Sequence, residues 1–293
     1  MTNETTQKGR TILAILAVVI GLFLIFVAPF ISQNALSTPL HRLIEVNQIQ
    51  DPDGVWDTPV GILTATFNVW IALFVFGGAI LIMIAKDIYA GKEWARPLAI
   101  TMMAIPSMGG MTMTIPWLVL VVTDALGNPN PEAGMPPAMP IMVVGLIGYF
   151  SMLLIEKASA MTKVAQTVVF LFHGVVGGMV FMNAQHGVRH FLTKGPFFNP
   201  TDSNPELFLG GFVMYAATAV FFVAIYFMAE RKELGWYAAM TVGIVTFAAA
   251  FLAFVDRYNV PSGQEWLRGA MLSAVYLIIM ALPWFKKRIY GQE

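Results

Sequence analysis

The chain has 293 residues, of which 57% are apolar and only 12% are charged, with no net charge and no cysteine. A soluble domain carries about 25% charged residues, so this composition excludes a soluble globular protein and indicates an integral membrane protein in a lipid bilayer. The zero net charge argues against nucleic acid as a partner, and the lack of cysteine excludes thiolate metal sites and iron–sulfur clusters built from these residues.

Eight apolar runs follow one another, most of them about as long as the 20 or so residues that cross a bilayer. The first run, 12–31, is too long for a signal-peptide core and has no small-residue cleavage site after it, so we expect it to be retained as a span. The polar segment 32–59 then carries the turn signals SQN, STP and DPDG. The further predicted spans are 60–85, 97–122, 139–155, 166–190, 207–228, 236–255 and 267–285.

This pattern predicts an all-α, polytopic helical membrane protein with about eight transmembrane helices. Eight spans place both termini on one side of the membrane. The loops on that side hold twelve Lys and Arg residues and the opposite loops hold five. Since basic residues are retained in the cytoplasm, we expect cytoplasmic N- and C-termini in an inner or plasma membrane.

Two proline residues interrupt the third predicted span. Pro106 and Pro116 each remove a backbone donor, and Gly109 and Gly110 lie between them. A helix with this content is expected to kink or break. Broken membrane helices often line binding sites, which motivates a carrier or channel hypothesis.

The two halves of the chain share an outline of helix, long loop, helix, short charged loop, helix, short loop and helix. At an offset of 140 residues, Lys92 and Glu93 align with Lys232 and Glu233. We therefore interpret residues 1–293 as one membrane domain built from repeat halves 1–160 and 161–293, a parallel 4+4 duplication.

The fifth predicted span carries three of the four histidines of the chain. On a helix at about 100° per residue, Met179 and Asn183 share one face with three candidate metal ligands, which are Met182, His186 and His190. Imidazole suits copper, iron and zinc, and a thioether selects softer ions such as Cu(I). One alternative is that these side chains contact a proton or another ligand. Another is that they only pack at the membrane interface, because methionine fills irregular gaps in packed interiors.

His173 lies on the opposite face of the same span, with Gly174 and Gly177 beside it, and these three are the candidate cofactor-binding residues. A bis-histidine haem needs imidazoles from two helices, and His41 is the only histidine outside this span. A haem would therefore need its other ligand from a methionine or from a partner chain. Our cofactor hypothesis is copper or haem with ligands supplied by a partner chain. Without a charged neighbour, His173 is otherwise expected to be neutral and hydrogen-bonded.

The charges of two short loops are interpreted as solvated groups that set the topology rather than the chemistry. They are the pairs Glu156–Lys157, Glu230–Arg231 and Lys232–Glu233. No Lys, Arg, Asp or Glu is predicted at mid-depth in any span. Phosphate-loop, dinucleotide-binding, zinc-protease and serine-hydrolase motifs are also absent from the sequence.

Three functions are compatible with these features. The favoured hypothesis is a non-catalytic subunit of a larger membrane assembly, such as a respiratory or other redox complex, in contact with other membrane protein chains. The alternative is a carrier or channel for a small neutral solute or a soft metal ion. A membrane-embedded enzyme is the least favoured, because the histidines are too few for a histidine-rich di-iron site.

Overall fold

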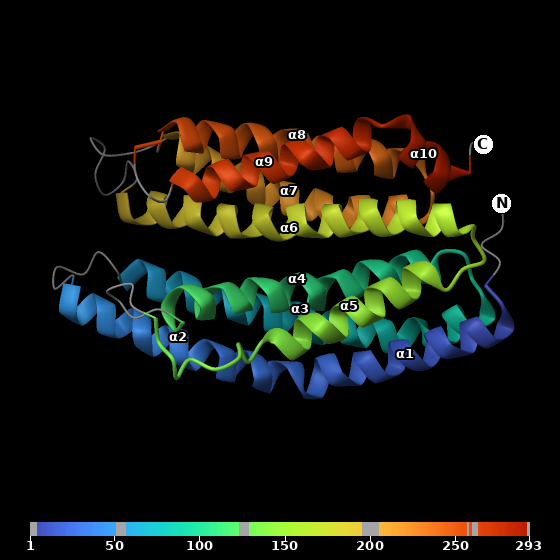
Figure 1. Cartoon of the computed structure of the whole chain (residues 1–293). Coiled ribbons are helices and arrows are strands. Elements are labelled where there is room, and N and C mark those ends of the chain that lie inside the picture. The colour runs from blue at the N-terminus through green and yellow to red at the C-terminus, as the bar shows by residue number, and fades with distance from the viewer. Residues whose placement is uncertain are drawn as a thin grey trace. The chain divides into compact units, whose positions relative to one another are not determined.

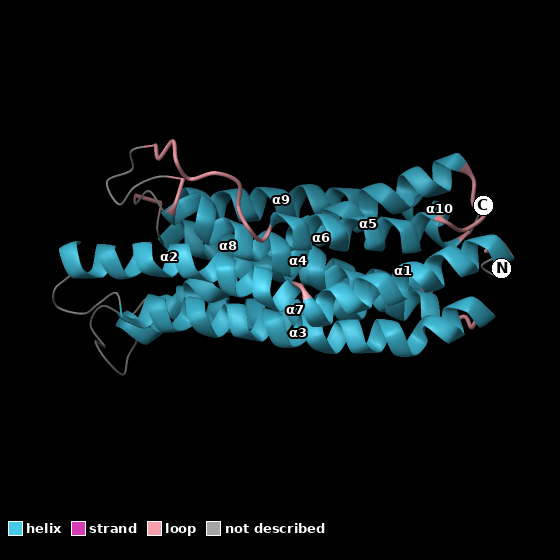
Figure 2. Ribbon diagram, turned by 90° about the horizontal axis from the view of Figure 1, so that it is seen from below, coloured by secondary structure: helices cyan, strands magenta, loops and turns pink. Residues whose placement is uncertain are grey.

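A computed structural model describes residues 5–50, 57–122, 129–194, 205–256, 258–259 and 263–291. These ranges are almost entirely helical and contain no strand (Figure 2). The predicted all-helical fold is therefore confirmed. The helices are α1 (Gln7–Phe26), α2 (Ala28–Gln50), α3 (Asp57–Ala90), α4 (Ala95–Leu120), α5 (Met139–Leu154), α6 (Ala160–Lys194), α7 (Pro205–Ala229), α8 (Glu233–Asp256), α9 (Gly263–Ala281) and α10 (Pro283–Tyr290).

Six of the described helices are long and apolar enough to cross a membrane, namely α1, α3, α4, α6, α7 and α8. Helices α9 and α10 form a pair bent by 63° that would make a seventh span. Helix α5 is also apolar but has only 16 residues. Each predicted apolar run thus coincides with a helix, and the class of polytopic helical membrane protein is confirmed. The count of eight spans stays a prediction.

The segment after the first span is helical, so the expectation of a turn-rich polar segment was wrong over α2. Side chains on one face of α2 are buried at intervals of three or four residues, and this face packs against α3. A helical stripe of this kind outweighs the local turn signals. The buried positions are Ala28, Ser32, Ala35, Pro39 and Leu43.

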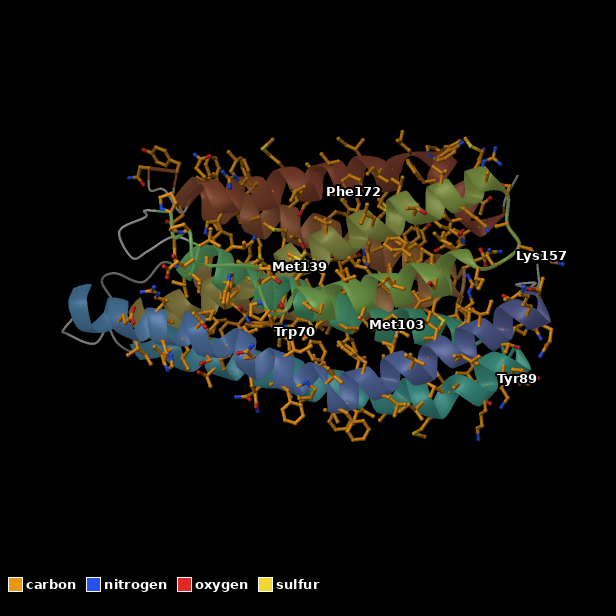
Figure 3. The ribbon with its side chains drawn as sticks, turned by 60° about the horizontal axis from the view of Figure 1, so that its bottom comes forward. Trp70, Tyr89, Met103, Met139, Lys157 and Phe172 are labelled. Carbon is orange, nitrogen blue, oxygen red and sulfur yellow. The ribbon has the colours of Figure 1, made fainter. Side chains whose placement is uncertain are left out.

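The described chain divides into two compact units, and each has its own core. Unit 1 consists of Met1–Arg10, Gly91–Thr101 and Phe150–Glu293, and unit 2 consists of Thr11–Ala90 and Met102–Tyr149. In unit 2, Trp70 on α3 and Met103 on α4 are buried in the core, whereas Tyr89 at the end of α3 is exposed (Figure 3).

The third span was expected to kink or break, and α4 continues as one helix through both of its prolines. A break is therefore wrong, and a kink stays a prediction. Glycines on α4 and α5 allow these two helices to pack closely against each other. A methyl group added to Gly110 would overlap the backbone of Met142 on α5, and one added to Gly145 on α5 would overlap the backbone of Ser107. The two backbones are therefore in direct contact, as small residues permit in membranes. This packing supports the α4 backbone where proline removes a hydrogen bond.

In unit 1, α6 contacts α7 and α9, and α8 contacts the same two helices, so the four form a closed bundle. Consecutive helices run in opposite directions, and α10 lies at one end of the bundle (Figure 1). We call this end the basic end. Its described residues are 7–10, 91–96, 154–163, 229–236 and 282–291.

Candidate functional site

His173 is completely buried inside the α6–α9 bundle. Its Nδ1 lies 2.7 Å from the hydroxyl of Tyr276 on α9, and its Nε2 lies 3.2 Å from the backbone carbonyl oxygen of Phe221 on α7. The imidazole also stacks on the Phe221 ring, with centroids 4.2 Å apart and an interplanar angle of 8°. One side chain of α6 therefore joins three helices.

The hydrogen-bond partners of His173 define its tautomer. A carbonyl oxygen can only accept, so Nε2 carries the proton that it donates to Phe221. The lone pair of Nδ1 then accepts the hydroxyl proton of Tyr276. The expectation of a hydrogen-bonded His173 is confirmed, and a metal or haem iron at Nδ1 would have to replace the Tyr276 hydroxyl.

The two glycines near His173 have different surroundings. A methyl group added to Gly177 would overlap the ring of Phe221, whereas one added to Gly174 would meet no atom within 4 Å. Gly177 thus makes room for the ring on which His173 stacks. A cofactor contact at these three positions stays a prediction.

The predicted metal ligands lie on the second half of α6, which is continuous from Ala160 to Lys194. Met182 is half-buried, and the side chains of His186 and His190 lie outside the described residues. Among the side chains that are described, no group of three or more His, Asp or Glu could hold a metal ion. The metal site therefore stays a prediction.

Asn183, on the same face of α6 as Met182, is buried against α9. A methyl group added to Gly269 of α9 would lie 2.8 Å from its Nδ2 and 3.7 Å from Cε of Met179. Nδ2 has no hydrogen-bond partner among the described groups. A buried amide in this state costs about 1–3 kcal/mol, so Asn183 is a costly polar group beside the predicted metal ligands.

A buried ion cluster at the basic end was missed by the sequence analysis. The side chain of Glu156 is only 2% exposed, so its interpretation as a solvated loop charge was wrong. Its Oε2 accepts a hydrogen bond of 2.6 Å from Arg96, and its Oε1 accepts bonds of 2.7 Å from Arg231 and 2.6 Å from Gln166. We call these four residues the Glu156 cluster. Lys157, Lys232 and Glu233 are exposed, as expected.

Arg96 has a second role in the cluster. Its Nε donates to the carbonyl oxygen of Met152 at 2.8 Å, and its Nη2 donates to that of Leu153 at 3.0 Å. The last carbonyls of a helix have no intrahelical donor, and a cation there is favoured by the helix dipole. One guanidinium therefore caps α5 and also neutralises Glu156.

Arg231 reaches the cluster from the turn between α7 and α8. Its φ is 59°, in the left-handed region that favours glycine. Its N–H bonds to the carbonyl of Met228, and the N–H of Lys232 bonds to that of Phe227, both at 2.9 Å. These two bonds form a Schellman turn, where glycine is usual. An arginine in this position carries backbone strain, and the ion pair with Glu156 offsets that strain.

Burial alone would raise the pKa of Glu156, but the guanidinium groups of Arg96 and Arg231, with the Gln166 and Arg96 hydrogen bonds, hold this pKa below its ordinary value. The carboxylate is therefore charged at neutral pH. Removing one partner of a buried ion pair costs about 3–5 kcal/mol, because the other charge is left uncompensated. The cluster thus binds the start of α4, the end of α5, α6 and the α7–α8 turn together.

A signal for the Glu156 cluster was present in the sequence, although it was not used. Glu156 follows an apolar run almost directly, and Arg96 begins another apolar run on the same predicted side. Opposite charges that border spans at the same depth can pair when their helices are neighbours. The sequence does not say which helices are neighbours, so the partners could not be assigned.

Comparison with protein families and with solved structures finds no match to this chain. Among curated proteins, the chain is similar to an E3 ubiquitin-protein ligase, RNFT1, of Xenopus laevis, with 29% identity over 117 residues. The match covers 38% of this chain and 27% of that protein. The chain therefore corresponds to about a quarter of the length of that relative.

Proposed function

We propose that this chain is a non-catalytic integral membrane subunit of a larger membrane assembly, such as a redox complex. The observation that carries the proposal is how the buried ionisable groups are used. Glu156 is bonded to three neighbouring side chains, and both ring nitrogens of His173 are bonded to adjacent helices. These groups hold helices together and are not presented to a substrate, which is typical of a structural subunit.

An apolar stripe on α8 supports contact with another chain. Its side chains are exposed at intervals of three or four residues on one face of the helix. The rings of Phe247 and Phe251 stack there, with centroids 5.9 Å apart and planes at 10°. Aromatic side chains are enriched in protein–protein interfaces and at membrane surfaces. The stripe consists of Ile244, Phe247, Phe251 and Val255.

We further propose that the outer part of α6 contacts a metal or a cofactor of the assembly. Met182, His186 and His190 supply thioether and imidazole groups, which suit copper or haem iron. A partner chain would supply the remaining ligands. This end of α6 is the outer end in the proposed orientation, in which the excess of basic residues places both termini in the cytoplasm.

The alternative function, a carrier or channel for a small neutral solute or a soft metal ion, is less well supported. It was motivated by a third span expected to kink or break, and α4 is a continuous helix. The ligase activity named for the relative is not transferred to this chain, because the match covers only 27% of that protein.

Mild-detergent purification of the tagged chain from its own membranes tests the proposal. Quantitative mass spectrometry would identify co-purifying chains, and elemental analysis with an absorption spectrum would measure copper, iron and haem. We expect stoichiometric membrane partners. We also expect metal or haem that is lost in a His186→Ala, His190→Ala double variant.

The matched control is His41→Ala, because His41 is an exposed histidine on α2 and is not one of the predicted ligands. It should leave partners and metal unchanged. A partner-free chain with solute flux in liposomes would contradict the subunit proposal. Stoichiometric partners without any metal would contradict only the proposed metal contact.

A further inference from the structure

The C-terminal helix α10 leaves the axis of the last apolar helix at a sharp angle. The bend of 63° occurs at Leu282, which is extended, and Pro283 then begins α10. Three consecutive cations, residues 286–288, lie on α10. Lys and Arg are expensive in the hydrocarbon core of a bilayer. Helix α10 therefore lies at the level of the lipid headgroups.

One face of α10 is fixed to the bundle. Ile289 is buried, and the hydroxyl of Tyr290 donates to the carbonyl oxygen of Lys232 at 2.9 Å. The ammonium group of Lys286 lies 3.2 Å from a carboxylate oxygen of Glu233 and 5.3 Å from the ring centroid of Tyr237. These contacts hold α10 in one orientation, so the side chains of its opposite face have defined positions.

The opposite face of α10 carries Trp284, Lys287 and Arg288, at the spacing of one helical turn. Trp284 and Lys287 are exposed, and Lys287 takes part in no ion pair with the described residues. An exposed apolar stripe runs along α9 to Leu282, the residue directly before α10. The stripe consists of Met271, Val275, Ile278 and Leu282. A lipid-facing stripe that ends in tryptophan and basic residues is typical of a membrane interface.

The surrounding charge is strongly positive. The described residues of the basic end include eleven Lys and Arg and four Glu, an excess of seven cations. Three of the acids are already engaged within this end: Glu156 with Arg96 and Arg231, Glu230 with Lys232, and Glu233 with Lys286. The net positive charge of this end therefore favours an anionic partner.

From these observations we infer that the outward face of α10 binds the headgroups of anionic phospholipids. Trp284 lies at the headgroup level, and Lys287 and Arg288 bind the lipid phosphate groups. The occupant is a lipid and not an acidic protein, because the face continues the apolar stripe of α9. With the proposed orientation, this surface faces the cytoplasmic leaflet, where anionic lipids attract basic segments.

Native mass spectrometry of the detergent-solubilised full chain tests this inference. Short-chain phosphatidylglycerol and short-chain phosphatidylcholine would be titrated separately, and the ratio of their affinities measured. We expect the wild-type chain to prefer phosphatidylglycerol. In a Lys287→Gln, Arg288→Gln variant the preference should fall about 30-fold, which corresponds to about fivefold for each basic residue.

The matched control removes two arginines elsewhere, the half-buried Arg42 on α2 and the exposed Arg268 on α9, with Arg42→Gln and Arg268→Gln. It should keep the wild-type preference, as should the charge-conserving variant Lys287→Arg, Arg288→Lys. Gel filtration and thermal unfolding would verify that each variant is folded. Equal binding of the two lipids by the wild-type chain would overturn the inference. An equal loss of preference in the Lys287→Gln, Arg288→Gln variant and in the Arg42→Gln, Arg268→Gln control would also overturn it. Neither result bears on the subunit proposal, which depends on co-purifying chains.

Discussion

The hydroxyl oxygen of Tyr276 on α9 lies 2.7 Å from Nδ1 of His173 on α6, and the two rings are 5.6 Å apart. Tyr276→Phe removes the hydroxyl and leaves Nδ1 as a buried acceptor without a donor. An unsatisfied buried group costs about 1–3 kcal/mol. We expect this loss in the free energy of unfolding, measured by denaturant titration in detergent micelles.

A double-mutant cycle separates this hydrogen bond from general packing. His173→Leu with Tyr276→Phe replaces both partners by apolar groups, so the double variant should lose less stability than the two single variants added together. Interhelical hydrogen bonds in membranes give coupling energies of about 0.6 kcal/mol on average, with a maximum of about 1.7. Strict additivity would show that the bond contributes nothing.

The two glycines beside His173 form a matched pair. A methyl group at position 177 would overlap the ring of Phe221, which cannot move freely because it is stacked on His173. Overpacking of this kind costs about 1–3 kcal/mol, so Gly177→Ala should lower the thermal unfolding midpoint. Gly174→Ala, which meets no atom within 4 Å, should change the free energy of unfolding by less than about 0.5 kcal/mol. Equal effects of the two substitutions would be inconsistent with this packing.

Removal of the Glu156 carboxylate leaves the guanidinium groups of Arg96 and Arg231 buried without their counter-ion. Glu156→Ala should therefore cost about 3–5 kcal/mol of unfolding free energy, measured by denaturant titration. The control is Glu233→Ala, because Glu233 is exposed and its ion pair with Lys286 contributes about 0–1 kcal/mol. A similar small effect of both substitutions would contradict the structural role of the cluster.

The ionisation of Glu156 should also make the stability of the folded chain depend on pH. The folded pKa of Glu156 is lowered, so the unfolded state, with an ordinary glutamate pKa of about 4.3, binds the proton first as the pH falls. The stability from Glu156 is complete well above this unfolded pKa and is lost as the pH falls through the folded pKa. Thermal midpoints measured against pH should therefore fall more steeply in acid for the wild-type chain than for Glu156→Gln. Parallel curves would exclude this titration.

The left-handed backbone of Arg231 can be tested by two substitutions that remove the same ion pair. Arg231→Ala keeps a side chain with a Cβ in a conformation that disfavours it, whereas Arg231→Gly relieves that strain. We expect the glycine variant to be more stable than the alanine variant by about 1 kcal/mol. An alanine variant of equal or greater stability would show that the turn carries no strain.

The positions of the membrane helices could be predicted from the sequence, because long apolar runs with few charges have one stable structure in a bilayer. The turn-rich interpretation of α2 failed for a physical reason. Ser32 and Pro39 were considered as local turn signals, but the helical spacing of the buried side chains decides the conformation when a neighbouring helix is present. The 4+4 duplication and the orientation of the termini stay predictions.

The candidate sites were harder to predict because they depend on long-range contacts. His173 could be recognised as a buried, hydrogen-bonded histidine, yet its partners Tyr276 and Phe221 lie 103 and 48 residues away. Glu156 was assigned to solvent because its own loop is polar. Its burial results from Arg96 and Arg231, which no local pattern connects to it.

The Glu156 cluster also sets an order for the biogenesis of the chain. Arg96 precedes Glu156 by 60 residues, and Arg231 follows it by 75. Because a ribosome releases the N-terminal part first, Arg96 and Glu156 can pair as a neutral couple while α7 is still being translated. The arrival of Arg231 converts that couple into a net cation and fastens the hairpin of α7 and α8 to helices that have already been inserted.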